Sequence, residues 1–595
     1  MNDRLLKLLL RPDLRLAGLG LSAVVAVYFG FIGLEVEVGG MVVKRYGYYF
    51  LLTAFVLWVV ALWQLWSRRA VGENLGRREW LLAGLAIALL SLVAISAESF
   101  RSKVLYDEFV LQSTAYNMHY FRDTATMVRG YDILGVFLST DNYLDKRPNF
   151  YPFLISLIHD FTGYRPLNAY LLNAVLLPVA LGLVYYLGRR LNGRRGGLLA
   201  VLLLGSLPLL GQNATGSSME LLNVTMLLAV AALAAAYLRQ PDDTRLSALV
   251  LGAVLLAQTR YESAIYVAPV AVIIMLGWWR ERRVIVSWTA VLAPLLLLPY
   301  ALQNKVLSNS KWMWELRDNR ETRFSLDYFL ENLGGAGEFF FNTNARLANS
   351  WPLTSLGLLA VVWVLWRLLR ARPAPSDANT EHTALLLLGL GMVANTVLIL
   401  FYYWSNLGDP LASRFSLPFH LVLAFAVVAA AAAFDRRWPV SWVLLGGMTV
   451  FALGVTTTRH AQHLYSYLGI DEVEWEKRYV ATLPPRERII VSNKSTLPWL
   501  LEKKSSILIG RARLVADRLK YQLEQGPYRD ILVLQSLRPT TAEGDHQLVP
   551  EDRLPPGFTL EVMVEKRFGT RISRISRLVS IQLAVEGDGL ATLSP

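Results

Sequence analysis

The chain has 595 residues, of which 54% are hydrophobic, and its formal net charge is +13. It contains no cysteine, which excludes disulfide bonds and thiolate zinc sites. Apolar runs of close to 18 residues or more recur along the chain, and runs of this length indicate membrane-spanning helices. We therefore predict an α-helical polytopic membrane protein with a small C-terminal soluble α/β domain.

The hydrophobic pattern predicts thirteen membrane-spanning segments. They cover about residues 14–33, 48–66, 80–97, 167–188, 196–211, 218–238, 245–259, 262–279, 284–303, 352–369, 383–404, 415–433 and 439–457. No signal-peptide cleavage site follows the first segment convincingly, so we expect it to be a retained helix. No tandem repeat, P-loop or dinucleotide-binding glycine motif is visible in the sequence.

The loops indicate how the chain is oriented. Clusters such as Arg68 with Arg69 and Arg189 with Arg190 all fall on one side if the spans alternate, and that side is predicted to be cytoplasmic. The N-terminus is then cytoplasmic, and an odd number of spans places residues 460–595 outside. The positive charge is accounted for by this topology and by anionic lipid headgroups, so no nucleic-acid partner is predicted.

Three regions are expected along the chain. Residues 1–79 hold two N-terminal transmembrane helices, residues 80–459 form the main membrane region, and residues 460–595 form an extracytoplasmic α/β domain. In that domain RIIVSN, SSILIG and DILVLQSL are predicted strands, and the sheet is expected to be partly parallel.

Two long outer loops interrupt the main membrane region. The first, residues 98–166, has aromatic and apolar residues at three-to-four spacing, which favours short helices along the membrane surface. The second, residues 304–351, is amphipathic and is interrupted by Gly334, Gly335 and Gly337. A long loop of this kind is typical of a functional segment, and the glycines suggest a hinge that closes over a site.

An acidic pair, Asp107 and Glu108, lies in the first outer loop. The two carboxylates could simply favour the start of a surface helix, since acids suit the first helical turn. Alternatively one of them removes a proton from an acceptor hydroxyl, which is a weak nucleophile until its proton begins to leave. The pair could also bind Mg²⁺ or Mn²⁺ through its oxygens.

Basic residues on the same predicted face could hold a phosphate. Lys146 and Arg147 lie in the motif DKRPNFYP, and Arg pairs with phosphate through a fork of donors. Ordinary interfacial snorkelling is the alternative for both. Arg260, with Glu262 close by, occupies a very short turn, where a structural ion pair and a substrate contact are both open.

Two further residues lie at the same level. Arg414 opens the twelfth predicted span and could be an interfacial anchor or a phosphate ligand. Glu220 opens the sixth, where it could be an ordinary acid at a helix N-terminus. The predicted topology brings all of these charged residues to one membrane face, which is what a shared pocket requires.

These motifs together resemble the GT-C class of integral-membrane glycosyltransferases, in particular the protein O-mannosyltransferases and the lipid A aminoarabinose transferases. The resemblance spans roughly residues 80–460 and rests on YDEF, DKRPNFYPFLISL, TGSSMELLNVTMLL, QTRYESAIYVAPV and SRFSLPFHLVLAF. In that class the acidic loop usually follows the first span, whereas here it follows the third.

The resemblance implies roles for individual residues. Asp107 would activate the acceptor, with Glu108 as its neighbour, and Lys146 or Arg147 would contact a polyprenyl phosphate. Arg260 would help to hold the same phosphate. Tyr151, Glu220, Glu262 and Arg414 are assigned to substrate binding as well.

The predicted function is therefore an inverting glycosyltransferase at the outer face of the cytoplasmic membrane. Its partners would be a polyprenyl-phosphate-linked sugar donor, an acceptor that is an envelope glycan, lipid or protein, and membrane lipids. The alternatives are a transporter or flippase, a polymerase or ligase acting on lipid-linked sugars, and a non-enzymatic scaffold. The mannosyltransferase-like motifs favour no metal, although relatives in the class use a divalent ion.

Overall fold

The computed structural model describes residues 11–68, 76–310, 320–343, 347–370, 380–456, 468–539 and 546–582. The chain divides into two compact units. The first, here called the membrane unit, consists of residues 1–111, 118–124 and 144–465. The second, here called the sheet unit, consists of residues 112–117, 125–143 and 466–595.

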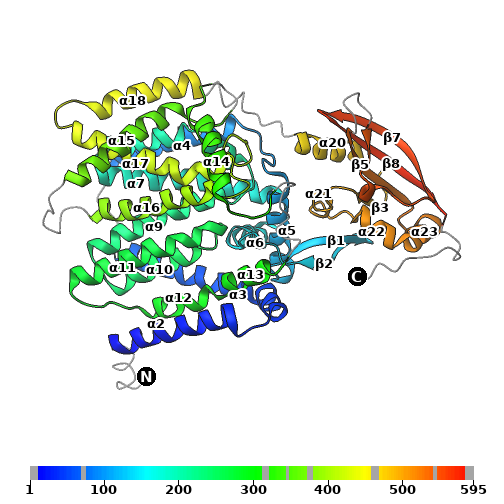
Figure 1. Cartoon of the computed structure of the whole chain (residues 1–595), viewed down its shortest axis with the longest axis horizontal. Helices are drawn as coiled ribbons and strands as arrows, with labels where there is room; N and C mark the ends of the chain where they lie inside the picture. The colour runs from blue at the N-terminus through cyan, green and yellow to red at the C-terminus, as the bar shows by residue number, and fades with distance from the viewer. Residues whose placement is uncertain are drawn as a thin grey trace. The chain divides into compact units, whose positions relative to one another are not determined.

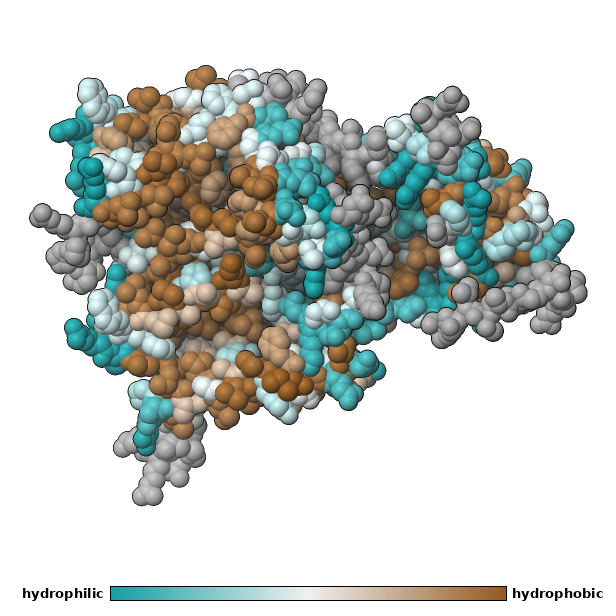
Figure 2. Space-filling model, viewed as in Figure 1, coloured by the Kyte–Doolittle hydropathy of each residue, from teal (hydrophilic) through white to brown (hydrophobic). Residues whose placement is uncertain are grey.

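The membrane unit is built from long apolar helices. Ten helices among the described residues are long and apolar enough to cross a membrane. They are α2 with η1 (Pro12–Ile32), α3 (Val36–Ser67), α4 (Arg77–Ser96), α7 (Leu167–Gly205), α9 (Glu220–Arg239), η2 with α11 (Tyr261–Glu281), α12 with α13 (Trp288–Ser308), α15 (Trp351–Arg370), α16 (Thr380–Leu400) and η4 with α17 (Ser413–Phe434) (Figure 1). Apolar residues cover much of their visible surface (Figure 2), as lipid contact requires.

Helix α7 reverses direction in its middle. Asn192 and Gly193 have non-helical backbone angles, with φ of −146° and 57°. A Cβ atom on Gly188 would lie 2.7 Å from the carbonyl oxygen of Gly196, although eight residues separate them in the chain. Since eight residues of straight helix span about 12 Å, α7 consists of two arms packed side by side, and the absence of side chains at both glycines permits the close approach.

The difference between ten long helices and thirteen predicted spans follows from this geometry. The two arms of α7 correspond to the predicted segments 167–188 and 196–211, the second of which runs on toward α8 (Pro208–Thr215). Two other predicted spans are the shorter helices α10 (Asp243–Leu256) and α18 (Val440–Phe451). The prediction of a polytopic helical membrane protein is confirmed.

The first outer loop differs from the expectation. It contains α5 (Leu105–Phe121) and α6 (Phe150–Thr162), but β1 (Thr126–Ile133) and β2 (Val136–Tyr143) form an antiparallel hairpin between them. Leu134 and Gly135 connect the strands with φ of 53° and 81°, as a tight hairpin turn requires. The expectation of helices alone was wrong for this hairpin, because the strand β1 is completed by β4, more than 370 positions away, and local periodicity does not reveal such a partner.

The second outer loop contains α14 (Leu326–Phe341), and residues 311–319 and 344–346 of the loop lie outside the described residues. Gly334, Gly335 and Gly337 lie inside this helix, so they do not interrupt the segment as expected. Gly335 has a packing role, because a Cβ atom there would lie 1.8 Å from Oδ1 of Asn406. The amide of Asn332 also donates to the carbonyl oxygens of Leu400 and Tyr402, both at 2.9 Å. Helix α14 is thereby joined to the segment that leads to α17.

The sheet unit contains a mixed sheet in the order β2-β1-β4-β3-β5-β8-β7, with β6 paired to β5. The remaining strands are β3 (Arg488–Ser492), β4 (Ser506–Leu508), β5 (Asp530–Pro539), β6 (His546–Gln547), β7 (Phe558–Phe568) and β8 (Arg571–Ile581). The helices are α20 (Leu468–Thr482), α21 (Leu497–Leu500), α22 (Ile509–Leu514) and α23 (Ala516–Glu524). Strand β3 is parallel to β4 and β5, so the predicted partly parallel sheet is confirmed.

Both faces of the sheet are covered. Ile489 and Val491 point into one apolar cluster, and Ile490 between them points into another on the opposite face. Alternate residues of β5 divide in the same way, with Ile531 on the first face and Leu532 on the second. Two covered faces explain why these strands are continuous apolar runs in the sequence.

Candidate active site

Asp107 lies in the first turn of α5 and is held by two arginines. Its Oδ1 accepts hydrogen bonds from Arg147, including one from Nε at 2.9 Å, and its Oδ2 accepts one from Nη2 of Arg414. The Asp107 side chain is 20% exposed. The carboxylate is therefore fixed in orientation and still reachable from outside the protein.

Arg147 is positioned by its own loop as well as by Asp107. Its Nη1 lies 2.8 and 2.9 Å from the two carboxylate oxygens of Asp145, and its backbone N donates to the same side chain. The amide of Gln303, from α13, donates to the carbonyl oxygens of Asp145 and Arg147 at 2.7 and 3.1 Å. The loop that carries Arg147 is thus fixed to α13, and the guanidinium group is held by Asp145 and Asp107.

A second layer of charges lies behind Arg414. Its Nη1 is 2.7 Å from Oε1 of Glu220, and the same oxygen accepts a hydrogen bond from Nη1 of Arg260. Nε of Arg260 donates to Glu262 at 2.5 Å. The Phe415 ring lies under both guanidinium groups, 4.8 Å from that of Arg260 and 5.2 Å from that of Arg414.

The helix ends explain why these residues meet. Glu220 is the first residue of α9, Arg260 precedes the short 3₁₀ turn η2 (Tyr261–Tyr266), and Arg414 lies in the 3₁₀ turn η4 (Ser413–Ser416). Each turn leads into a spanning helix, so the charges gather at the ends of the apolar segments. The structure therefore brings together Asp107, Arg147, Glu220, Arg260, Glu262 and Arg414, here called the charge cluster.

The cluster keeps Asp107 ionised. Burial would raise the pKa of its carboxyl group, but the positive charges of Arg147 and Arg414 outweigh burial and hold that pKa well below its usual range. For Arg147, burial works against the charged form, and the charges of Asp145 and Asp107 raise its pKa well above the usual value. At neutral pH the Asp107 carboxylate is accordingly a hydrogen-bond acceptor.

Glu108 points away from this cluster and has a different environment. It is fully buried, and its carboxylate accepts hydrogen bonds from the backbone N of Lys103 at 3.0 Å and of Ser217 at 3.2 Å. Burial raises the pKa of Glu108 to about 7 despite these bonds. One carboxylate thus connects the loop before α5 to the loop before α9, and the two acids of the pair do not act at one point.

Two other predicted site residues are placed differently from the cluster. Tyr151 is fully buried in α6, and its hydroxyl donates to the carbonyl oxygen of Ala169 at 3.0 Å, which is a packing contact. Lys146 is half-buried beside Arg147 in the chain. Their assignments to substrate binding stay predictions.

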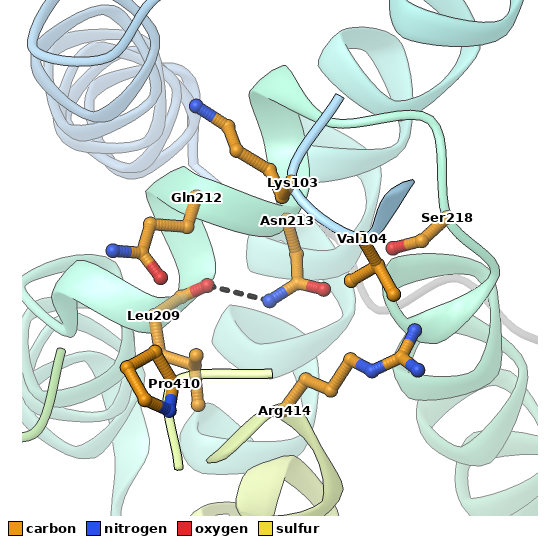
Figure 3. A pocket seen from close by; sticks show the side chains of 8 residues that line it. All are labelled: Lys103, Val104, Leu209, Gln212, Asn213, Ser218, Pro410 and Arg414. Atoms are coloured by element: carbon orange, nitrogen blue, oxygen red, sulfur yellow. Dashed lines mark hydrogen bonds between the residues drawn. The ribbon is translucent and has the colours of Figure 1, made fainter. Parts of the chain in front are cut away.

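A polar cavity adjoins the charge cluster. It is small and is lined by Lys103, Val104, Leu209, Gln212, Asn213, Ser218, Pro410 and Arg414 (Figure 3). Arg414 belongs to both, since it lines the cavity and also contacts Asp107. The cavity has amide and hydroxyl groups beside apolar ones.

Sequence reasoning missed several residues at the site. Asp145 directly precedes the Lys146–Arg147 motif and could have been found as the partner of its arginine. Gln303 gave no signal, because it lies in the last turns of an apolar segment. Asn213 lies in the short helix α8, whose first residues the prediction had assigned to a spanning segment that ends at residue 211.

The residues present do not fit a divalent metal ion. Arginines occupy both oxygens of Asp107, and backbone N–H groups occupy those of Glu108. The part of the chain that the structure describes holds no group of three or more His, Asp or Glu side chains that could ligate an ion. Binding of Mg²⁺ or Mn²⁺ by the acidic pair, which the sequence left open, therefore finds no support in these side chains, and no chemical step is derived through a metal.

A known protein family matches a segment of the chain that contains much of the charge cluster. Residues 146–302 match the family described as dolichyl-phosphate-mannose-protein mannosyltransferase. This segment begins just before Arg147 and includes Glu220, Arg260 and Glu262 of the charge cluster. A search of curated protein sequences found no match.

One solved structure has a similar fold, and a second gives a weaker match. ArnT from Cupriavidus metallidurans bound to undecaprenyl phosphate is 14% identical, with a TM-score of 0.52, covering 84% of this chain and 98% of that one. An oligosaccharyltransferase from Archaeoglobus fulgidus, in complex with zinc and sulfate, is 13% identical with a TM-score of 0.41, covering 75% of this chain and 67% of that one.

These findings bear on the predicted resemblance to a family. Residues 146–302 match the mannosyltransferase family model and the fold is similar to that of ArnT, so the predicted resemblance to membrane glycosyltransferases of the GT-C type is confirmed. Within that class the chain resembles the protein mannosyltransferases in residues 146–302 and ArnT in its fold over most of its length.

Proposed function

We propose that this protein is an inverting glycosyltransferase that moves a sugar from a polyprenyl-phosphate donor to a hydroxyl group of an acceptor. The observation that carries the proposal is the Asp107 side chain held between Arg147 and Arg414 in a partly exposed position. It combines a proton acceptor with cations that can bind a phosphate. The similar protein ArnT, solved with undecaprenyl phosphate, supports a lipid-linked donor.

The arginines suit the donor phosphate. Arg147 and Arg414 each present a fork of N–H donors, and a phosphate accepts such bonds more strongly than neutral groups do. A phosphate that engages them competes with Asp107 for the same guanidinium groups. As the arginines turn toward the phosphate, Asp107 loses part of their stabilising charge, and its pKa rises toward that of a useful base.

The proposed step is balanced without a co-reactant. The acceptor oxygen forms a bond to the anomeric carbon while the bond from that carbon to the phosphate oxygen breaks. The electron pair leaves with the polyprenyl phosphate, whose new charge the arginines stabilise. The hydroxyl proton passes to the Asp107 carboxylate, and attack from the face opposite the leaving group inverts the anomeric centre.

The proposed location is the outer face of the cytoplasmic membrane. The distribution of arginines among the loops supports an N-terminus in the cytoplasm. The charge cluster lies at helix ends on the opposite side from these loops if the spans alternate. The acceptor would then be an envelope glycan, lipid or protein reached from the extracytoplasmic side.

The test is transfer from a panel of radiolabelled polyprenyl-phosphate sugars to envelope acceptors by the purified protein. We expect transfer by the wild type and a loss of about 10²- to 10⁴-fold for Asp107→Asn. The matched control is Asp141→Asn, since Asp141 is a half-exposed acid of β2 whose nearest partner atom, on Arg129, is 3.7 Å away. Full activity of Asp107→Asn would overturn the role of the base.

The same radiolabelled donors, followed in the transfer assay, in vesicles and in a binding assay, separate the alternatives. A transporter or flippase would move intact donor across vesicle membranes without cleaving it. A polymerase or ligase would transfer a glycan from a lipid pyrophosphate donor and not a single sugar from a monophosphate. Binding without either reaction would favour a scaffold.

A further inference from the structure

The ring of Phe415 contacts the charge cluster, although Phe415 carries no charge and the proposed reaction has not yet used it. Phe415 belongs to the turn η4 and directly follows Arg414. The centroid of its ring lies 4.8 Å from the Cζ atom of Arg260 and 5.2 Å from that of Arg414. An aromatic ring attracts a cation within about 6 Å, because the face of the ring carries partial negative charge. One uncharged side chain therefore attracts two positive charges of the site.

The two arginines approach each other closely at this point. Oε1 of Glu220 accepts a hydrogen bond from Nη1 of Arg260, and the same oxygen lies 2.7 Å from Nη1 of Arg414. Only 5% and 6% of the two arginine side chains are exposed, so water screens the repulsion between them weakly. Other carboxylates of the charge cluster balance the two charges from outside the pair. Glu220 and the Phe415 ring are contacts that both arginines share, so these two contacts hold the pair together.

The contact between Arg414 and Glu220 attracts the guanidinium group without orienting it. Nη1 of Arg414 is buried and makes no hydrogen bond to any group that the structure describes, although Oε1 of Glu220 is 2.7 Å away. A hydrogen bond requires a suitable angle as well as a short distance. The directional bonds of Arg414 are those from Nε to the carbonyl oxygen of Leu411, at 3.0 Å, and from Nη2 to Asp107.

Arg414 is therefore held differently from Arg147 once a phosphate arrives. In the proposed reaction the donor phosphate replaces Asp107 as a partner of both arginines. Arg147 then keeps its contacts with Asp145, whose two oxygens lie 2.8 and 2.9 Å from Nη1. Arg414 keeps one directional bond, to its own turn, together with the Phe415 ring. The ring thus holds Arg414 during the exchange, as Asp145 holds Arg147.

We propose that Phe415 is a positioning residue for phosphate binding. The face of its ring holds the guanidinium group of Arg414 beside that of Arg260 while Arg414 exchanges Asp107 for the donor phosphate. The inference rests on the proposed function, because that function supplies the phosphate. It goes beyond that function by assigning a role to an uncharged side chain, which acts through the two arginines.

The experiment measures the affinity of the purified full-length protein, in lipid nanodiscs, for bare undecaprenyl phosphate. Phe415 is replaced in turn by phenylalanine with one, two and three fluorine atoms on the ring. Each fluorine atom withdraws electrons from the face of the ring and weakens its attraction for cations, while the ring keeps nearly the same size. The affinity should fall stepwise with each fluorine atom, by roughly 3- to 10-fold for three, which is the usual strength of a cation–π contact. The melting temperature of each protein shows whether it is folded.

Phe419 provides the matched control. It lies one turn further along the same segment, in α17, and is half-buried like Phe415. Its ring packs edge-on against that of Phe340, with the centroids 5.5 Å apart. The same fluorinated series at Phe419 should leave the affinity for undecaprenyl phosphate unchanged. Phe415→Leu keeps an apolar side chain and removes the ring, so it should lower the affinity at least as much as three fluorine atoms do.

The outcomes separate this inference from the proposed function. If the wild type binds undecaprenyl phosphate and the affinity stays constant or rises along the series at Phe415, the ring acts by packing alone. The inference is then overturned, while the proposed function stands. An equal stepwise loss at Phe419 overturns the inference too, because the effect would not depend on the arginines. If the wild type does not bind undecaprenyl phosphate, the proposed function fails and the inference fails with it.

Discussion

Arg414 joins Asp107 to Glu220, although Asp107 lies 307 positions earlier in the chain. One terminal nitrogen of its guanidinium group donates to Oδ2 of Asp107, and the other lies 2.7 Å from Oε1 of Glu220. A single arginine therefore holds the carboxylate at the exposed end of the charge cluster and the carboxylate at its buried end. It also lines the polar cavity.

Sugar transfer should require the two N–H-bearing arms of the Arg414 guanidinium group, and not only its positive charge. Arg414→Lys preserves the positive charge, but one ammonium nitrogen cannot occupy both positions of the guanidinium group. We expect a folded protein whose transfer rate is lowered about 10²-fold and whose affinity for bare undecaprenyl phosphate is also reduced. Thermal unfolding and transfer kinetics are the measurements.

The control for Arg414→Lys is Arg280→Lys, in the last turn of α11 and outside the charge cluster. It should leave both the transfer rate and the phosphate affinity unchanged. Wild-type transfer by Arg414→Lys would mean that a point charge suffices there and that the fork has no role.

Glu108 should make stability depend on pH in a direction opposite to that of most acids. Its pKa in the folded protein is about 7, above the ordinary value of about 4.3, so the folded state binds the proton more tightly than the unfolded state. The resulting stability is fully present below the ordinary pKa and is lost as the pH rises through about 7. Glu108→Gln has no such proton. The melting temperature of the wild type should therefore fall relative to that of the variant from pH 5 to pH 8.

The difference in stability between the wild type and Glu108→Gln at low pH has a separate cause. The amide nitrogen of glutamine cannot accept from a backbone N–H, so Glu108→Gln should lose one hydrogen bond, about 1 kcal/mol, at low pH. Only the change with pH tests the protonation of Glu108. A constant difference from pH 5 to pH 8 would show that Glu108 does not titrate in this range.

Two neighbouring glycines of α14 should respond differently to the same substitution. Gly335→Ala would place a Cβ atom 1.8 Å from Oδ1 of Asn406, and it should push away this amide oxygen, which accepts from the backbone N of Gly408 at 3.0 Å in the turn that leads to Arg414. We expect a lower melting temperature and weaker binding of bare undecaprenyl phosphate. Overpacking of this kind typically costs about 1–3 kcal/mol.

Gly334→Ala is the matched control, because no atom lies within 4 Å of a Cβ atom at this position. Alanine is the better helix former by about 1 kcal/mol, so Gly334→Ala should be neutral or stabilising. Equal effects of the two substitutions would indicate that the contact between α14 and Asn406 is unimportant for stability.

The sequence by itself determined the membrane class, because lipid requires long apolar helices and the pattern of hydrophobic residues records them directly. It also identified the charged residues of the cluster, since charges at the ends of apolar segments are costly unless they are paired or used. It determined the apolar strands β3 and β5 as well, because a sheet covered on both faces gives continuous apolar runs.

The tertiary structure decided which charges meet and how. It paired Asp107 with Arg147 and Arg414 and turned Glu108 toward backbone N–H groups, because successive residues of a helix point in different directions. It also joined the first outer loop to the C-terminal sheet through β1 and β4, and folded α7 back on itself at Asn192 and Gly193. These features depend on partners far away in the chain, and a local pattern of residues carries no record of such partners.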